Sequence, residues 1–112
     1  MQPTVEPVLK VYFYRSLAGN EPVRDWLKSL PVHERQAIGE DIQAVQFRWM
    51  GMPLVKKLAG KVWEVRTQLP TRISRVLFTV QGDQMVLLHG FIKKTQSTPK
   101  PDIDLALSRI DF

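Results

Sequence analysis

The sequence predicts an α+β fold, with two N-terminal helices packed on a small antiparallel sheet and a short C-terminal helix. Between residues 22 and 49 apolar residues recur at helical spacing, and beyond Pro53 the pattern changes to alternation. The alternating segments are joined by short turns, which is typical of an antiparallel meander. The 112 residues, 44% of them hydrophobic, fit one domain that spans residues 1–112.

The N-terminal half predicts one strand and two helices. Residues 8–14 alternate and are rich in β-branched and aromatic side chains, as strands are. Pro22 is suited to the first turn of a helix that ends before Pro31. A second helix is expected over residues 31–49, and its apolar stripe consists of Ile38, Ile42, Val45 and Trp49.

The C-terminal half predicts three strands and the last helix. The strands are expected over residues 62–69, 73–80 and 85–93, with a tight turn at residues 81–83. Pro99 and Pro101 precede the apolar positions of a short helix. The largely buried side chains are expected to be Trp26, Ile38, Ile42, Val65, Val76, Phe78 and Leu88.

Charge and composition narrow the classes of function. The formal net charge is +5 and the sequence pI is about 9.8, which favours a polyanion or an acidic protein as partner. Cysteine is absent, and His33 and His89 lie far apart, so neither a disulfide nor a zinc site is expected, and no cofactor. No apolar run reaches the ~18 residues of a membrane helix and no signal peptide is recognisable, so a cytoplasmic protein is expected.

Cationic side chains recur on the predicted strands. Glu64 and Arg66 are two residues apart and therefore share one face of their strand, whereas Trp63 and Val65 point into the core. Arg75 lies on the next strand. Several cations on neighbouring strands predict a concave face that binds the phosphates of RNA or DNA. Its members are Lys57, Lys61, Arg66, Arg75, Lys93 and Lys94.

Three segments carry a resemblance to a known family. They are Lys57-Leu58 with Trp63-Glu64-Val65-Arg66, then Ser74-Arg75-Val76-Leu77, and Leu88-His89-Gly90-Phe91-Ile92-Lys93-Lys94-Thr95-Gln96 followed by Thr98-Pro99. With these motifs the chain resembles the RelE/ParE superfamily of toxins from bacterial toxin–antitoxin modules, in its HigB-like, phage-derived branch. The resemblance covers nearly the whole chain and implies a RelE-like fold.

The resemblance also implies a function. It implies a ribosome-dependent mRNA endonuclease that needs no metal, inhibits translation, and is neutralised by a HigA-like helix-turn-helix antitoxin. The catalytic residues that it implies are Arg66, Arg75 and Lys94, and Glu64 is a further candidate, although classical RelE toxins carry a basic residue at its position. Lys57, Lys61 and Lys93 would bind RNA. The family's acid–base tyrosine has no counterpart between Ser97 and Asp104.

Several of these roles have structural alternatives. Arg75 is expected to clamp a phosphate through its planar guanidinium, but it could instead pair with Glu64 across the strands. Glu64 could be a general base or a structural partner of Arg66 or Arg75. Lys93 and Lys94 could be solvated surface charges. His89 suits acid–base chemistry, but a strand histidine is more often packed and hydrogen-bonded.

The fold leaves two other functions open. One is a ParE-like inhibitor of gyrase, which would share the fold without nuclease activity. The other is a non-catalytic, phage-derived accessory protein. The set of Arg66, Arg75 and Lys94 favours RNA over gyrase, since cations placed together suit phosphate chemistry.

Overall fold

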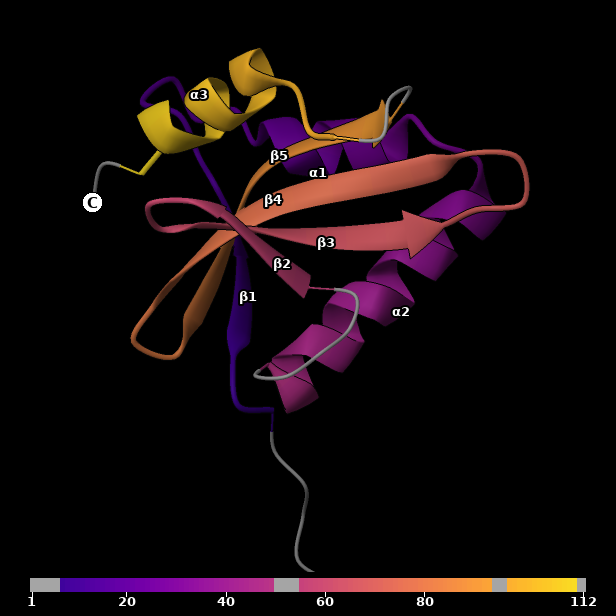
Figure 1. Ribbon diagram of the computed structural model, residues 1–112, viewed down its shortest axis with the longest axis horizontal. Coiled ribbons are helices and arrows are strands. Elements are labelled where there is room, and N and C mark those ends of the chain that lie inside the picture. The colour runs from indigo at the N-terminus through magenta and orange to yellow at the C-terminus, as the bar shows by residue number, and fades with distance from the viewer. Residues whose placement is uncertain (1–6, 50–54, 94–96, 111–112) are drawn as a thin grey trace, which may run out of the picture.

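The computed structural model describes residues 7–49, 55–93 and 97–110. Five strands and three helices are described there, and their positions in the fold are shown in Figure 1. They follow in the order β1 (Lys10–Phe13), α1 (Pro22–Lys28), α2 (Val32–Arg48), β2 (Val55–Ala59), β3 (Val62–Gln68), β4 (Ile73–Gln81), β5 (Gln84–Lys93) and α3 (Lys100–Ser108). This confirms the predicted α+β fold class.

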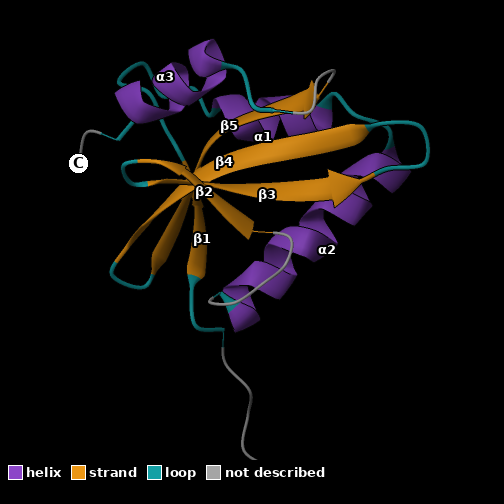
Figure 2. Ribbon diagram, viewed as in Figure 1, coloured by secondary structure: helices purple, strands orange, loops and turns teal. Residues whose placement is uncertain are grey.

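The sheet is mixed rather than wholly antiparallel. Its strand order is β1-β5-β4-β3-β2, and the four strands from β2 to β5 form the expected antiparallel meander. The N-terminal strand β1 lies at the edge and runs parallel to β5. In the view of Figure 2 the strands run at different angles to one another, which reflects the normal twist of a sheet. Strand β2 was not predicted, because adjacent lysines at 56 and 57 break its alternation.

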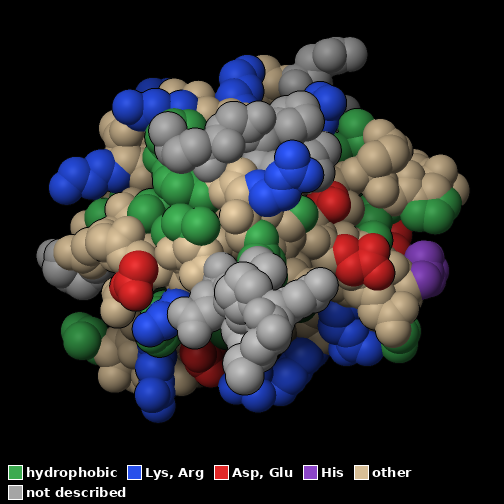
Figure 3. Space-filling view, turned by 90° about the horizontal axis from the view of Figure 1, so that it is seen from below, with side chains coloured by type: hydrophobic (Ala, Val, Ile, Leu, Met, Phe, Trp, Pro, Cys, Tyr) green, Lys and Arg blue, Asp and Glu red, His purple; other side chains and the backbone are tan. Residues whose placement is uncertain are grey.

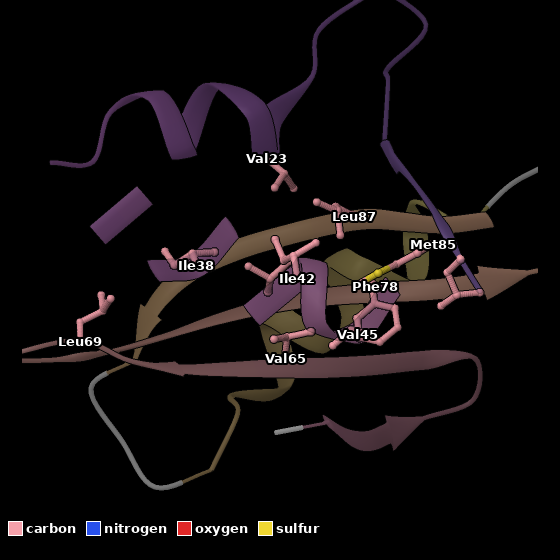
Figure 4. Close-up of a cluster of buried hydrophobic side chains, with 11 residues drawn as sticks. Val23, Ile38, Ile42, Val45, Val65, Leu69, Phe78, Met85 and Leu87 are labelled. Atoms are coloured by element: carbon pink, nitrogen blue, oxygen red, sulfur yellow. The ribbon is translucent and has the colours of Figure 1, made fainter. Parts of the chain in front are cut away.

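The larger of two apolar cores lies between the sheet and the helices α1 and α2. Figure 4 shows helix side chains such as Val23 and Ile42 pointing toward strand side chains such as Val65 and Phe78. A second core lies on the other face, under α3. It consists of Val62, Leu77, Val86, Leu88 and Ala106. The sheet is therefore covered on both faces, which the alternating pattern of the strands did not indicate.

Six of the seven side chains predicted to be largely buried are buried. Trp26 is the exception, because it is half-buried and packs against the edge of the α1–α2 core. Leu88 is fully buried but lies in the core under α3 rather than on the face of Gly90 and Ile92. The cause is an irregularity in β5, where the register with β4 shifts between Leu77 and Phe78. Such a bulge reverses the facing of a strand from that point on.

The start of α2 is tied to the β3–β4 turn by an ion pair that the sequence did not predict. Glu34 accepts a hydrogen bond from Arg72, with 2.9 Å between Arg72 Nε and Glu34 Oε2, and a second one from the other end of the guanidinium. The Glu34 residue is buried, whereas the Arg72 side chain is partly exposed. The hydrogen bond from Arg72 lowers the pKa of Glu34 below its ordinary value of 4.5.

A lowered pKa makes the contribution of Glu34 to stability depend on pH. The contribution is present above the ordinary pKa and is lost as the pH falls through the pKa of the folded state. We therefore expect Glu34→Gln to lower the melting temperature at about pH 7, and the difference from wild type to shrink as the pH falls below the ordinary pKa of 4.5. Thermal unfolding followed as a function of pH measures this. A difference that does not change with pH would exclude the ion pair as its cause.

Gly90 of β5 leaves room for the indole of Trp26. A Cβ at this position would lie 2.4 Å from ring atoms Cε3 and Cζ3 of Trp26, closer than any real contact. Gly90→Ala should therefore push α1 away from the sheet and cost about 1–3 kcal/mol of unfolding free energy, as overpacking does. Chemical denaturation checks this, and Gly90→Ala combined with Trp26→Leu should recover part of the loss. Gly39→Ala serves as the control, because a Cβ there meets nothing within 4 Å.

The helices α1, α2 and α3 have 7, 17 and 9 residues. Across the described parts of the chain, none has the length and apolar character needed to cross a membrane.

Candidate functional site

Three of the predicted site residues come together on the sheet face that α3 covers. Arg66 of β3 lies directly opposite Arg75 of β4, and Glu64 lies opposite Leu77, one position further along that face. The facing predicted for β3 is confirmed, because Val65 is fully buried on the other side and Trp63 packs there. We refer to Glu64, Arg66 and Arg75 as the central cluster.

Glu64 and Arg75 form a buried ion pair. Glu64 is 1% exposed and Arg75 is 5% exposed. The Arg75 guanidinium donates to Glu64 Oε1, and the hydroxyl of Thr98 donates to Glu64 Oε2. Both carboxylate oxygens are therefore engaged. The structure thus contains the cross-strand pair that the sequence left as the alternative for Arg75, and it supports the interpretation of Glu64 as a structural partner.

Burial has an electrostatic consequence for Arg75. Desolvation lowers the pKa of Arg75 below the usual value for a guanidinium, since the charged form loses its hydration. The group remains a cation because arginine starts from so high a value. The charge of Arg75 is partly offset by Glu64 beside it. Arg66 differs, because it is exposed at the same level of the sheet. Arg66 is the arginine of the central cluster that reaches solvent.

The end of β5 adds further groups to this face. Phe91 lies opposite Arg75, and its ring packs against the core under α3. Lys93 is the last residue of β5, pairs with Ile73, and is half-buried. By alternation Lys93 points to the same face as Phe91. Lys94, predicted to be catalytic, lies outside the described residues.

His89 is packed and hydrogen-bonded, as the sequence indicated. Its Nε2 lies 2.7 Å from Asp102 Oδ1 at the start of α3, and its ring stacks on Phe91 at 5.3 Å between centroids. Asp102 lies in the first turn of α3, where a carboxylate interacts favourably with the helix dipole. Contacts with Glu64 and His89 thus hold Thr98 and the first turn of α3 to the sheet. In the parts of the chain described here, no three acidic or histidine side chains are grouped to hold a metal ion.

The structure does not bring Lys57 and Lys61 into the central cluster. Lys57 pairs with Trp63, and its ammonium lies 5.8 Å from the centre of the Trp63 ring, which belongs to the opposite face of β3. Lys57 and Lys61 line a separate hollow of about 440 Å³ beside the β2–β3 and β4–β5 turns. In the view of Figure 3, Lys and Arg side chains are spread over the surface with Asp and Glu between them.

The contact that the sequence reasoning missed is that of Thr98 with Glu64. The Thr98-Pro99 motif stood in the segment that carried the family resemblance, but no rule of spacing links it to Glu64, which is 34 residues away. Phe91 was likewise not predicted to lie opposite Arg75, because the bulge in β5 decides its register.

Comparison with known proteins places the chain in a family. The model of the family described as "Phage derived protein Gp49-like (DUF891)" matches residues 25–111, which include the central cluster. Two relatives from Mycobacterium tuberculosis, strains CDC 1551 / Oshkosh and ATCC 25618 / H37Rv, are each named "Probable endoribonuclease HigB1". Each is 31% identical over 98 residues, which cover 87% of this chain and 78% of the relative. The chain therefore belongs to the phage-derived Gp49-like family and is HigB-like within it.

Proposed function

We propose that this protein is the toxin of a type II toxin–antitoxin module and that it cleaves mRNA on the translating ribosome in the cytoplasm. The observation that carries the proposal is the likeness, over 87% of the chain, to a relative named as a probable endoribonuclease. The central cluster supports it, because the exposed Arg66 lies opposite the buried Arg75, so a phosphate bound by Arg66 would also lie near the charge of Arg75.

The proposed reaction is an internal transfer at phosphorus that needs no metal ion. The 2′-oxygen of a nucleotide attacks the adjacent phosphate as it loses its proton to a base. The bond from phosphorus to the 5′-oxygen of the next nucleotide breaks, and that oxygen takes up a proton from an acid. The products are a 2′,3′-cyclic phosphate and a free 5′-hydroxyl. Negative charge builds up on the phosphate oxygens during the transfer, and nearby cations lower the barrier.

Arg66 and Arg75 take different parts in this proposal. Arg66 is exposed and contacts the phosphate directly. Arg75 is the second cation of the clamp, and its pairing with Glu64 fixes the position of its guanidinium. A cation in such a dry environment acts more strongly on a nearby charge than one in open water. Lys94 contributes to the same step, and Lys57, Lys61 and Lys93 bind RNA outside it.

Glu64 could either orient its neighbours or act as the general base, and its burial favours the first of these roles. With both oxygens engaged, it orients Arg75 and Thr98. It could accept the proton of the 2′-hydroxyl only if Thr98 moved away, because its carboxylate is closed to solvent. We therefore propose the orienting role for Glu64.

The test is cleavage of a defined mRNA on translating ribosomes, with the same RNA free in solution as the control. We expect cleavage on the ribosome alone, 2′,3′-cyclic phosphate ends on the upstream fragment, and no added metal requirement beyond that of the ribosome. Cleavage products with 3′-hydroxyl ends would exclude the proposed chemistry. Intact mRNA together with inhibited gyrase would instead identify a ParE-like inhibitor.

The proposal includes a protein partner. A toxin of this kind needs neutralisation, so we propose that a small HigA-like helix-turn-helix antitoxin is encoded beside it. Co-expression of the neighbouring reading frame should restore growth, and the two proteins should purify together. Abundant expression of this chain alone without growth arrest would argue against toxicity.

A further inference from the structure

The outer edge of β1 directs backbone groups away from the sheet. The backbone N–H of Lys10 donates to Asp83, and that of Tyr14 donates to Leu87, so these alternate residues of β1 bond toward β5. In a parallel strand the residues between them, Val11 and Phe13, direct their N–H and C=O groups to the other side. In the described part of the chain β5 is the one strand that pairs with β1.

Helix α2 covers this edge at one end only. Leu9 N donates to the carbonyl of Gln46 at 2.9 Å, and the Gln46 side chain donates to the Leu9 carbonyl at 3.2 Å. The backbone N–H and C=O of Leu9 therefore point away from β5, and Gln46 of α2 forms hydrogen bonds with both. Beyond it, no strand of the described part of the chain pairs with the outward side of Val11 and Phe13. Unpaired edges of this kind are sites where another chain can add a strand.

A groove of about 510 Å³ runs beside this edge on the face that α3 covers. It is lined by Tyr12 and Tyr14 of β1 and Val86 of β5, together with Leu17 and Arg109. Tyr12 is 47% exposed and Leu17 is fully exposed, although both are large and apolar in part. Tyrosine and arginine are the residue types enriched where protein partners bind tightly.

The charge of the groove is positive. Arg15 and Arg109 line it, and among the described residues no carboxylate does. Arg109 is held in place, because it donates to the Leu88 carbonyl at 2.7 Å and lies over the ring of Tyr14 at 5.1 Å. A fixed guanidinium on an aromatic floor suits a carboxylate that arrives next to an apolar side chain.

We propose that the β1 edge and its groove form a docking surface for an extended segment of a partner protein. The segment adds a strand along Val11 and Phe13 and directs alternate side chains into the groove, with acidic residues near Arg15 and Arg109 and apolar ones on Tyr12 and Leu17. Outward N–H and C=O groups favour a peptide over RNA, because RNA cannot continue a sheet ladder. This surface is separate from the central cluster, and its test does not depend on nuclease activity.

The probe is an acetylated peptide, Val-Thr-Glu-Thr-Val-Thr-Glu-Thr, in which Val and Glu share one face of a strand. We expect saturable binding to the intact protein, followed by NMR, with shifts at Val11 and Phe13 and slower hydrogen exchange of both amides. The same peptide with lysine in place of glutamate should bind at least about tenfold more weakly. An octanucleotide RNA tests the alternative ligand.

Two variants test separately how the groove charge and the backbone hydrogen bonds of β1 contribute to peptide binding. Arg15→Glu reverses a groove charge, and Val11→Pro removes an outward N–H, which an edge strand tolerates. Each variant should bind the peptide about tenfold more weakly, while its melting temperature stays within a few degrees of the wild-type value. The control variant Lys28→Glu on α1 should leave peptide binding unchanged. Lack of saturable peptide binding, binding that neither variant weakens, or preferential binding of the RNA at this groove would each overturn the proposal.

Discussion

An Arg66→Ala variant is expected to cleave mRNA on the ribosome about a hundredfold more slowly than wild type, because one positioned donor to the developing charge is lost. Its stability should not change, since the Arg66 side chain is exposed. The measurement is the single-turnover cleavage rate on translating ribosomes, with the melting temperature recorded in parallel. Ribosome binding should change much less than the rate.

Two matched variants decide whether the position of the Arg66 charge matters. Arg66→Lys keeps the charge but not the planar pair of donors, and it should recover little of the rate. Arg48→Ala removes an exposed arginine from the end of α2, which packs on the opposite face of the sheet from the central cluster, and should cleave normally. Wild-type cleavage by a folded Arg66→Ala variant would remove Arg66 from the proposed site.

Arg75→Ala is expected to lose both activity and stability. Arg75 is buried and paired with the buried Glu64, so its removal affects the fold as well as the site. Without Arg75, a carboxylate remains buried beside Thr98 with no cation against it. Breaking a buried pair in this way typically costs about 3–5 kcal/mol of unfolding free energy. Chemical denaturation of the two proteins measures the loss.

A double variant separates the two effects. Glu64→Gln with Arg75→Met removes both charges and keeps similar volumes, so most of the stability should return, as it does for other buried pairs. Cleavage should stay low, because the second cation of the clamp is missing. A double variant that is stable and fully active would show that the pair serves the fold alone. In that case Arg66 and the lysines would carry the chemistry.

Local sequence patterns determined most of the secondary structure. Proline at 22 and 31 and the stripe of Ile38, Ile42 and Val45 predicted α1 and α2 within a few residues, since such patterns depend on neighbours three or four positions away. Alternation predicted β3 and its facing, with Glu64 and Arg66 on one side and Val65 on the other. The family resemblance pointed to Arg75 as a functional residue, but it did not indicate which side chains surround it.

The remaining features depend on contacts between distant parts of the chain, which local patterns do not encode. The parallel pairing of β1 with β5 joins residues more than 70 positions apart, as Lys10 and Gln84 show. The bulge in β5 sent Leu88 to the core under α3, because a single extra residue reverses the facing of a strand. Thr98 reaches Glu64 only because α3 folds back over the sheet. The sequence by itself thus determined the elements and the cationic residues, while tertiary packing decided that Arg75 is buried against Glu64 and that Arg66 faces solvent.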